Sequence, residues 1–294
     1  MTQIASLPVR SSHIAEELDE LRKRGPLRQI VIPPCPALLR RLQQVMAQPD
    51  PDLQEIDQIA SSDVAMAATL LRNANSPLHA VGQPVHTVGQ AMNRLGLQES
   101  AAVLTGFMAR HTIPVNHPHL RGFWAESAQR AAAMQFLAAQ LPGMAAELAH
   151  LYGLFCHVGI PVLMQSVRGY SGTLVEARAR LDRPFVLTEN ANHRTDHAVV
   201  GALVARAWHL PTGVMAAIRL HHDVEGLGHR SADPETHSLV AAGLLADFLI
   251  RRRDGLDPEA DWTRHGQAAL DWLEVSSDDL SDWTPQLNAV LDAV

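Results

Sequence analysis

Apolar residues recur at three- and four-residue spacing along almost the whole of this 294-residue chain. In the run from Leu151 to Leu163, for example, Leu151, Leu154 and Phe155 fall on one helical stripe that would face a core. Aromatic residues make up only 4% of the chain, so aliphatic residues and alanine must fill the interior. Apart from a short extended segment at 29–32, no stretch shows strand alternation. The sequence therefore predicts an all-α fold.

Proline and glycine divide this predicted helical bundle into segments. The stretch HTIPVNHPHLRG, with prolines at 114 and 118, is the main internal boundary, but it is too short for a free linker. We therefore expect two packed lobes. The predicted segments are an N-terminal helix at 1–26, an N-terminal lobe at 27–113, a second helical lobe at 119–253 and acidic, tryptophan-containing helices at 254–294.

The second lobe carries the most regular helical pattern. Proline and glycine punctuation predicts where its helices begin and end. The expected helices are 123–141, 144–165 as one helix or two, 173–181, 188–208, 211–222 and 234–253.

Charge and cysteine content exclude several classes of protein. The formal net charge of −7, from 31 acidic and 24 basic residues, argues against a nucleic-acid-binding surface. No apolar run is expected to be long enough to cross a bilayer, and the first residues lack the apolar core of a signal peptide. Two distant cysteines, Cys35 and Cys156, indicate reduced thiols rather than a disulfide framework. We therefore expect a cytoplasmic protein with neither nucleic acid nor membrane as a partner.

Two residues able to bind metal, Cys156 and His157, stand side by side in the apolar run from Leu151 to Leu163. Successive helical residues diverge by about 100°, so both could point inward and meet ligands from other helices. The alternative is that Cys156 is a small buried hydrophobe and His157 a hydrogen-bonded core histidine. The local pattern leaves both interpretations open.

Several stretches follow one another in an order that is more specific than any one of them. They are IVIPPCPALLRRLQQVMAQ, NANSP, VHTVGQAMNRLG, FWAESAQRA, YGLFCHVGIPVL, DHAVVGALVARAWHLP and AIRLHHD. Between about residues 27 and 253 the chain thereby resembles the HDOD domain, a degenerate relative of the HD metal-dependent phosphohydrolases found in bacterial signalling proteins. The resemblance implies an HD-like helical bundle with a signalling role.

The resemblance also implies where the metal ligands of catalytic relatives would fall. Those relatives use a histidine, a His-Asp pair, later histidines and a final aspartate. The corresponding positions here are Glu126, then Cys156 and His157, then His197, His221 and His222, and last Asp247. The His-Asp pair that gives the HD family its name is therefore absent.

This absence argues against two-metal chemistry. A carboxylate can touch two cations about 3.5–4 Å apart, whereas a neutral imidazole coordinates through one nitrogen, so His157 cannot replace a bridging aspartate. A single metal remains an alternative, since the implied positions offer a mixed set of oxygen, sulfur and nitrogen ligands that suits zinc or iron. Without a metal, the later histidines would form a hydrogen-bonded polar cluster with carboxylates such as Asp196, Asp223 or Asp247.

These arguments favour a non-catalytic signalling or output module with no bound cofactor. It would bind a protein partner, or alternatively a small ligand, through a degenerate HD-type cleft. His221 and His222 can serve that one cleft only at a helix end, because adjacent helical residues diverge. The competing function is a single-metal phosphohydrolase or phosphodiesterase with a mixed Glu/Cys/His/Asp site.

Overall fold

The computed structural model describes residues 11–23, 25–224 and 233–294, and this part of the chain contains helices but no strand. The prediction of an all-α fold is confirmed. The predicted extended segment at 29–32 instead follows a short 3-10 helix, η1 (Gly25–Gln29), without forming a strand. Residues 1–10 and Arg24 of the predicted N-terminal segment lie outside the described residues.

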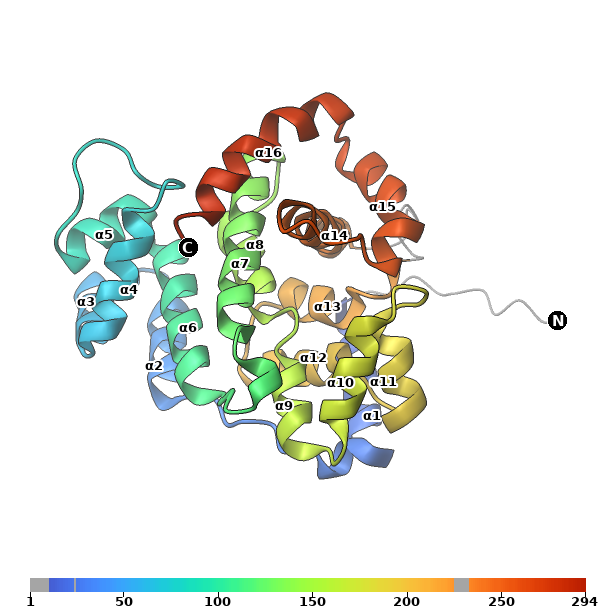
Figure 1. Cartoon of the computed structure of the whole chain (residues 1–294). Coiled ribbons are helices and arrows are strands. Elements are labelled where there is room, and N and C mark those ends of the chain that lie inside the picture. The colour runs from blue at the N-terminus through green and yellow to red at the C-terminus, as the bar shows by residue number, and fades with distance from the viewer. Residues whose placement is uncertain (1–10, 24, 225–232) are drawn as a thin grey trace.

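The N-terminal part of the bundle projects to one side of the molecule, on the left in Figure 1. Several of its helices start at a side chain that accepts hydrogen bonds from the first turn, such as Asp52, Asp63 and Thr87. Its helices are α2 (Ala37–Met46), α3 (Leu53–Ser61), α4 (Val64–Ala74), α5 (Val88–Leu95) and α6 (Leu97–Thr112). The preceding α1 (Ser11–Lys23) lies apart from them, against the second lobe.

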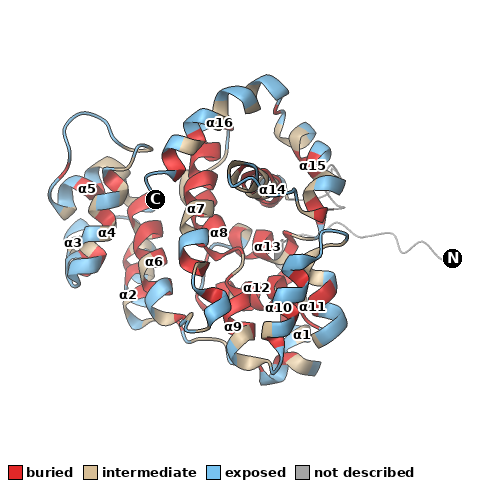
Figure 2. Ribbon diagram, in the orientation of Figure 1, coloured by how far each residue is buried: buried red, intermediate tan, exposed pale blue. Residues whose placement is uncertain are grey.

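The second lobe is centred on the most deeply buried helices (Figure 2). One connected cluster of buried apolar residues runs from Ile14 in α1 to Leu291 near the C-terminus, so both predicted lobes share a core. The helices of the second lobe are η2 (Pro118–Leu120), α7 (Phe123–Gln140), α8 (Ala146–Phe155), α9 (Gly159–Ser166), α10 (Tyr170–Ala179), α11 (Phe185–His193), α12 (His197–Ala207), α13 (Thr212–Leu220) and α14 (Pro234–Arg253). The C-terminal segment at 254–294 forms α15 (Ala260–Leu273) and α16 (Ser277–Leu291).

One predicted helix, 188–208, is wrong. The chain forms α11 and α12 instead, because Arg194 adopts a left-handed conformation (φ 56°) and ends the first helix. Asp196 then starts the second helix by accepting a hydrogen bond from the backbone of Val199. The break turns α12 so that its first residue, His197, faces the interior, where it is buried.

Two glycines allow helices to approach closely around this interior. A Cβ at Gly153 of α8 would lie 2.8 Å from the backbone of Ala131 in α7. A Cβ at Gly159 would lie only 2.1 Å from the backbone oxygen of His197. Neither position has space for a larger residue, so these glycines set the distances between α7 and α8 and between α9 and α12.

The expectation that no apolar run is long enough to cross a bilayer is also wrong. Among the described residues, the segment Ala146–Ser166 has the length and composition of a membrane span. It consists of α8 and α9, and 78% of its most apolar window is buried within the protein. Core helices of globular proteins commonly have this composition, so the segment is weak support for a membrane span.

The N-terminal helix α1 is held on α12 and α13 by two arginines. Arg206 donates to the backbone oxygen of Ala15 and pairs with Asp19 at 2.6 Å, and Arg219 pairs with Glu17 at 2.6 Å. These contacts fasten the start of the chain to the two helices that bring His197 and His221 to the interior.

A buried carboxylate lies where α6 meets α7 and α8. Glu99 of α6 accepts a hydrogen bond from Gln135 of α7 at 2.5 Å, and its Oε1 lies 3.5 Å from His150 Nδ1 in α8. Its Oε2 has no hydrogen-bond partner among the described residues. Burial, reinforced by the charge of Glu147, raises the pKa of Glu99 to about 7.

Glu99→Gln is expected to stabilise the protein at alkaline pH. The native pKa of Glu99 is above its unfolded value of about 4.5, so ionisation above that pH favours the unfolded chain, and the full penalty is present above about pH 7. We expect the substitution to raise the free energy of unfolding by about 2–3 kcal/mol at pH 8 and to change it little at pH 4. Urea unfolding at the two pH values measures the difference. Glu126→Gln, at an exposed carboxylate, is the control; equal effects of Glu99→Gln at both pH values would contradict the argument.

Candidate functional site

Four histidines from separate parts of the second lobe meet in its interior. One nitrogen from each of His157, His197, His221 and His222 lies within 4.8 Å of the others. His157 lies in the turn between α8 and α9, and His197 begins α12. The expectation that His221 and His222 share a cavity only at a helix end is confirmed, because α13 ends at Leu220.

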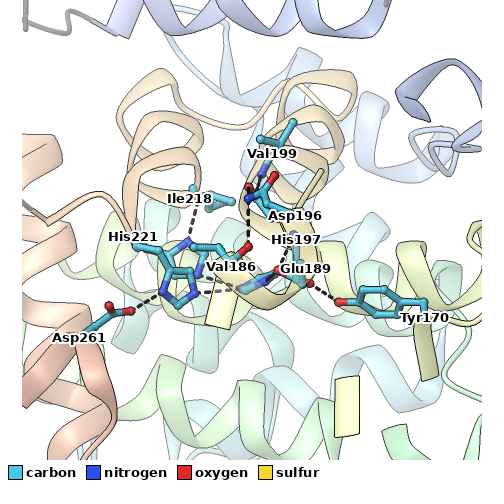
Figure 3. Close-up of polar contacts among 11 residues, drawn as sticks. Tyr170, Val186, Glu189, Asp196, His197, Val199, Ile218, His221 and Asp261 are labelled. Atoms are coloured by element: carbon cyan, nitrogen blue, oxygen red, sulfur yellow. Dashed lines mark hydrogen bonds and ion pairs between the residues drawn. The ribbon is translucent and has the colours of Figure 1, made fainter. Parts of the chain in front are cut away.

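Three of these rings are oriented by a hydrogen bond from the Nδ1 atom (Figure 3). His221 Nδ1 donates to the backbone oxygen of Ile218 at 2.7 Å. His197 Nδ1 lies 2.7 Å from Glu189 Oε2, and His222 Nδ1 lies 2.5 Å from Asp261 Oδ2. Carbonyl or carboxylate acceptors on Nδ1 commonly fix histidine ligands of metals, since they leave Nε2 free to coordinate.

Glu189 accepts several hydrogen bonds. Its Oε1 accepts the hydroxyl of Tyr170, and its Oε2 accepts both the backbone N–H of His197 and that residue's ring. A carboxylate oxygen that accepts the backbone N–H of His197 can accept from the ring of the same residue as well. The Nδ1 atom of His197 therefore carries the proton, and its Nε2 atom presents a lone pair to the cluster.

The Nε2 atoms converge at distances that would suit a cation between them. His197 Nε2 lies 3.1 Å from His221 Nε2 and 3.3 Å from His222 Nε2. With each Nδ1 acting as donor and each ring neutral, lone pairs would face one another across these contacts. One added proton could satisfy only one of the two contacts. A tetrahedral metal with bonds of about 2.05 Å has donor–donor edges of about 3.3 Å and would satisfy both.

Electrostatics keep part of the cluster uncharged. Burial, with the positive charge of Arg130 nearby, holds the pKa of His157 well below its ordinary value. Burial and His222 do the same for His221. Burial also lowers the pKa of His222, but the hydrogen bond and charge of Asp261 outweigh it, so the net pKa is raised. His157 and His221 therefore carry the unprotonated nitrogens that metal binding requires.

Cys156, although next to His157 in sequence, is not part of the cluster that the histidines form. It is buried and makes a hydrogen bond with Tyr152. Burial raises the pKa of its thiol to about 12, so the sulfur is a neutral thiol rather than a thiolate ligand. Both cysteines are free, and Cys35 lies in the N-terminal part of the chain, just before α2.

The two implied carboxylate ligands are also engaged elsewhere. Asp247 of α14 forms an ion pair with Arg130 of α7, with 2.6 Å between Oδ1 and Nε. Glu126 is exposed, and its nearest cationic partner is Arg178, at 3.7 Å. Of the seven implied positions, the structure brings together His157, His197, His221 and His222, and it does not bring Glu126, Cys156 or Asp247 into the same set.

The carboxylates that contact the histidines differ from the expected ones. We expected Asp196, Asp223 or Asp247, but Asp196 caps α12 and Asp247 pairs with Arg130. Glu189 and Asp261 take this role instead. Sequence reasoning missed both because Glu189 lay inside a helix predicted to be continuous, and Asp261 lies beyond the stretch that carried the resemblance.

A small cavity adjoins the histidines. Its volume is about 20 Å³, and its lining includes Tyr152, His157, Asp247, Arg251 and Asp261. A space of this size holds about one water molecule and excludes a phosphate ester. A larger cavity of about 450 Å³ lies elsewhere, between the α7–α8 connection, the start of α14 and the end of α15.

The bundle and its histidine cluster define an all-α protein with an HD-like fold. The chain belongs to the HDOD domain family, whose model matches residues 32–224. It is 28% identical over 229 residues, or 77% of its length, to an uncharacterised protein of Treponema pallidum (strain Nichols). The chain spans only 44% of the length of that relative.

Two solved structures share the fold. A candidate signal transduction protein of Marinobacter aquaeolei VT8 matches with a TM-score of 0.71 and 19% identity, over 96% of this chain and 64% of the other. A candidate metal-dependent phosphohydrolase of Shewanella amazonensis SB2B matches with a TM-score of 0.67 and 20% identity, over 96% of this chain and 99% of the other. At these identities the likeness establishes the fold, and activity must be argued from the site.

Proposed function

We propose that this chain is a non-catalytic HDOD signalling module whose former catalytic cleft holds one structural transition-metal ion on four histidines. The observation that carries this proposal is the convergence of His197, His221 and His222 through Nε2 atoms 3.1–3.3 Å apart, each with its Nδ1 on an acceptor. His157 supplies the fourth nitrogen. An all-nitrogen set favours zinc or iron over magnesium.

The metal would link three parts of the lobe. His157 belongs to the α8–α9 turn, His197 to α12, and His221 and His222 to the end of α13. If the ion is zinc, four protein ligands would leave no position open for substrate, which is the arrangement of structural rather than catalytic zinc sites. The ion would therefore supply stability to the lobe, and the residues that orient the rings would set its affinity.

Metal analysis tests this proposal. Protein purified without chelator is expected to carry about one equivalent of zinc or iron, and His197→Ala is expected to reduce it to background. Chelation should lower the free energy of unfolding by about 4 kcal/mol if the metal is present at about 1,000 times its Kd. The matched control is His111→Ala, at an exposed histidine outside the cluster. Wild-type protein that stays metal-free when supplied with zinc and iron would refute the proposal.

The alternative of a single-metal phosphohydrolase has less support. Its expected mixed ligand set is not assembled, and the cavity beside the histidines, about 20 Å³, is too small for a phosphate ester. We expect metal-loaded protein to leave bis(p-nitrophenyl) phosphate unhydrolysed, with and without added Mn²⁺. Turnover that disappears in His197→Ala would establish the alternative.

We also propose that the output of the module is contact with a protein partner rather than capture of a small ligand in the histidine cleft. The same small cavity supports this choice, because small-molecule sites usually enclose about 300–1,000 Å³. A small ligand would have to use the larger cavity beside α15. Affinity capture with wild-type protein and His197→Ala as baits, followed by reconstitution with the purified partner, tests the proposal. Failure of every captured protein to bind after purification would contradict it.

A further inference from the structure

Helix α15, outside the residues matched by the family model, forms one wall of the histidine site. Asp261 and Trp262 in its first turn line the cavity beside the histidines, as does the preceding residue, Glu259. Figure 1 shows α15 as an outer helix beside α14, between α14 and α16 in the chain. The site is thus closed by a segment that follows the domain in sequence.

The contacts that hold α15 over the site combine polar pairs with partly buried apolar residues, among them Trp262, Leu270 and Leu273. Asp261 holds His222 at 2.5 Å, and Glu259 pairs with Arg251 at 3.0 Å. Trp262 stacks on Phe248 of α14, with 4.0 Å between ring centres and 4° between ring planes. Further along α15, Arg264 donates to the backbone oxygen of Asp182 at 3.1 Å. Each polar contact can be exchanged for water or solvent ions when the helix moves away.

The apolar burial of α15 is shallow. Its buried residues are Ala260, Asp261, Gly266 and Ala269, which are small apart from the aspartate. By contrast, α12 buries valines and leucine along most of its length. Stability differs between the parts of a fold according to such burial, and elements with little of it open first.

With α15 packed over the histidine site, one buried polar atom of this helix has no hydrogen-bond partner among the described residues. This atom is Oδ1 of Asp261, a residue that is only 4% exposed. A buried carboxylate oxygen without a donor disfavours the closed state, because opening returns it to water. Asp261 therefore orients His222 and, through its unpaired oxygen, also favours movement of α15 away from the site.

Both ends of α15 have backbone conformations suited to bending. Gly255 (φ 69°) lies in the connection from α14, and Glu274 (φ 56°) ends α15 in a left-handed conformation. Beyond them, α14 packs on α7, and α16 buries Leu287 and Leu291 against the core. The flanking helices can remain docked while α15 moves.

We propose that α15 is a releasable latch over the histidine cluster: loss of its Asp261–His222 and Trp262–Phe248 contacts opens the cluster to solvent while the rest of the bundle stays folded. Access to the cluster for ions and small reagents is then controlled by α15. The inference concerns the site of the proposed function but does not require a metal to be bound there.

Hydrogen exchange of the full-length protein tests the latch. Amides of α15 are expected to exchange at least about ten-fold faster than those of α12 under native conditions, and to do so without global unfolding. Asp261→Ala and Trp262→Ala should each speed exchange along α15 further and leave α12 unchanged. Asp271→Ala is the matched control, since Asp271 is exposed on the same helix and bonds only to Gln267.

Chemical modification provides a second measurement on the same variants. Carbethoxylation of His222 by diethyl pyrocarbonate, mapped by mass spectrometry, is expected to be several-fold faster in Asp261→Ala than in Asp271→Ala, with exposed His111 as reference. Exchange of α15 and α12 at equal rates, or unchanged modification of His222, would overturn the latch. Metal content is measured separately, so a metal-free protein with a mobile α15 would refute the structural metal and keep the latch.

Discussion

Gly159→Ala is expected to lower the free energy of unfolding by about 4 kcal/mol or more, because among the described glycines its added Cβ would meet the closest contact. The new Cβ would lie 2.1 Å from the backbone oxygen of His197 and 2.8 Å from the backbone nitrogen of Gly201. Backbone atoms cannot rotate away as a flexible side chain can, so α9 and α12 would have to separate. Urea unfolding followed by circular dichroism measures the change, and metal content should fall with it because His157 and His197 move apart.

Gly172→Ala is the matched control for this substitution. Gly172 also lies in a helix, α10, but a Cβ there would meet no atom within 4 Å. Alanine favours the helix and restricts the unfolded chain, so we expect stabilisation by about 0.5–1 kcal/mol. Equal changes in the free energy of unfolding for Gly159→Ala and Gly172→Ala would show that the close contact at Gly159 does not limit the packing of α9 on α12.

Arg130→Met is expected to destabilise the protein by about 3 kcal/mol. The substitution leaves Asp247, whose side chain is 25% exposed, without its cation beside the histidine site. Burial disfavours the charge on Arg130, but the nearby Asp247 outweighs burial and raises the arginine pKa, so the guanidinium stays charged in the folded protein. Thermal and urea unfolding measure the loss.

The double variant Arg130→Met with Asp247→Leu distinguishes two causes of the lost stability. One is the loss of attraction within the ion pair, and the other is the carboxylate of Asp247 left without its cation. Replacing both partners removes the uncompensated carboxylate, so most of the lost stability should return. Arg180→Met, which breaks an ion pair with Asp182 at the surface, should leave the melting temperature unchanged. A double variant no more stable than Arg130→Met would show that the charge of Asp247 is not the cause.

The residues of the site suggest how the metal-binding side chains of an HD-type cleft can differ while the cleft stays at the same place in the fold. The carboxylate nearest the expected final ligand, Asp247, is held by Arg130, and the position of the bridging aspartate is a histidine. Three of the four histidines, His197, His221 and His222, are oriented by Glu189, a backbone carbonyl and Asp261. Such a set suits one tightly held ion and lacks the bridging group that two-metal catalysis requires.

Local sequence signals determined the helical class and many helix limits. Helical periodicity predicted the all-α fold, and proline and glycine predicted α14 at Pro234–Arg253 and α7 to within a residue. The order of motifs identified the family and pointed to His157, His197, His221 and His222. These properties depend on residues close together in sequence, whose spacing is readable without a structure.

Only the tertiary structure decided which candidate ligands meet. Cys156 and His157 are neighbours in sequence, yet the turn after α8 directs the histidine into the cluster and leaves the cysteine with Tyr152. Glu189 and Asp261 reach the histidines from α11 and α15, through a helix break at Arg194 and a helix beyond the family match. Sequence spacing fixes which face of one helix a side chain occupies, but contacts between helices depend on how their cores pack.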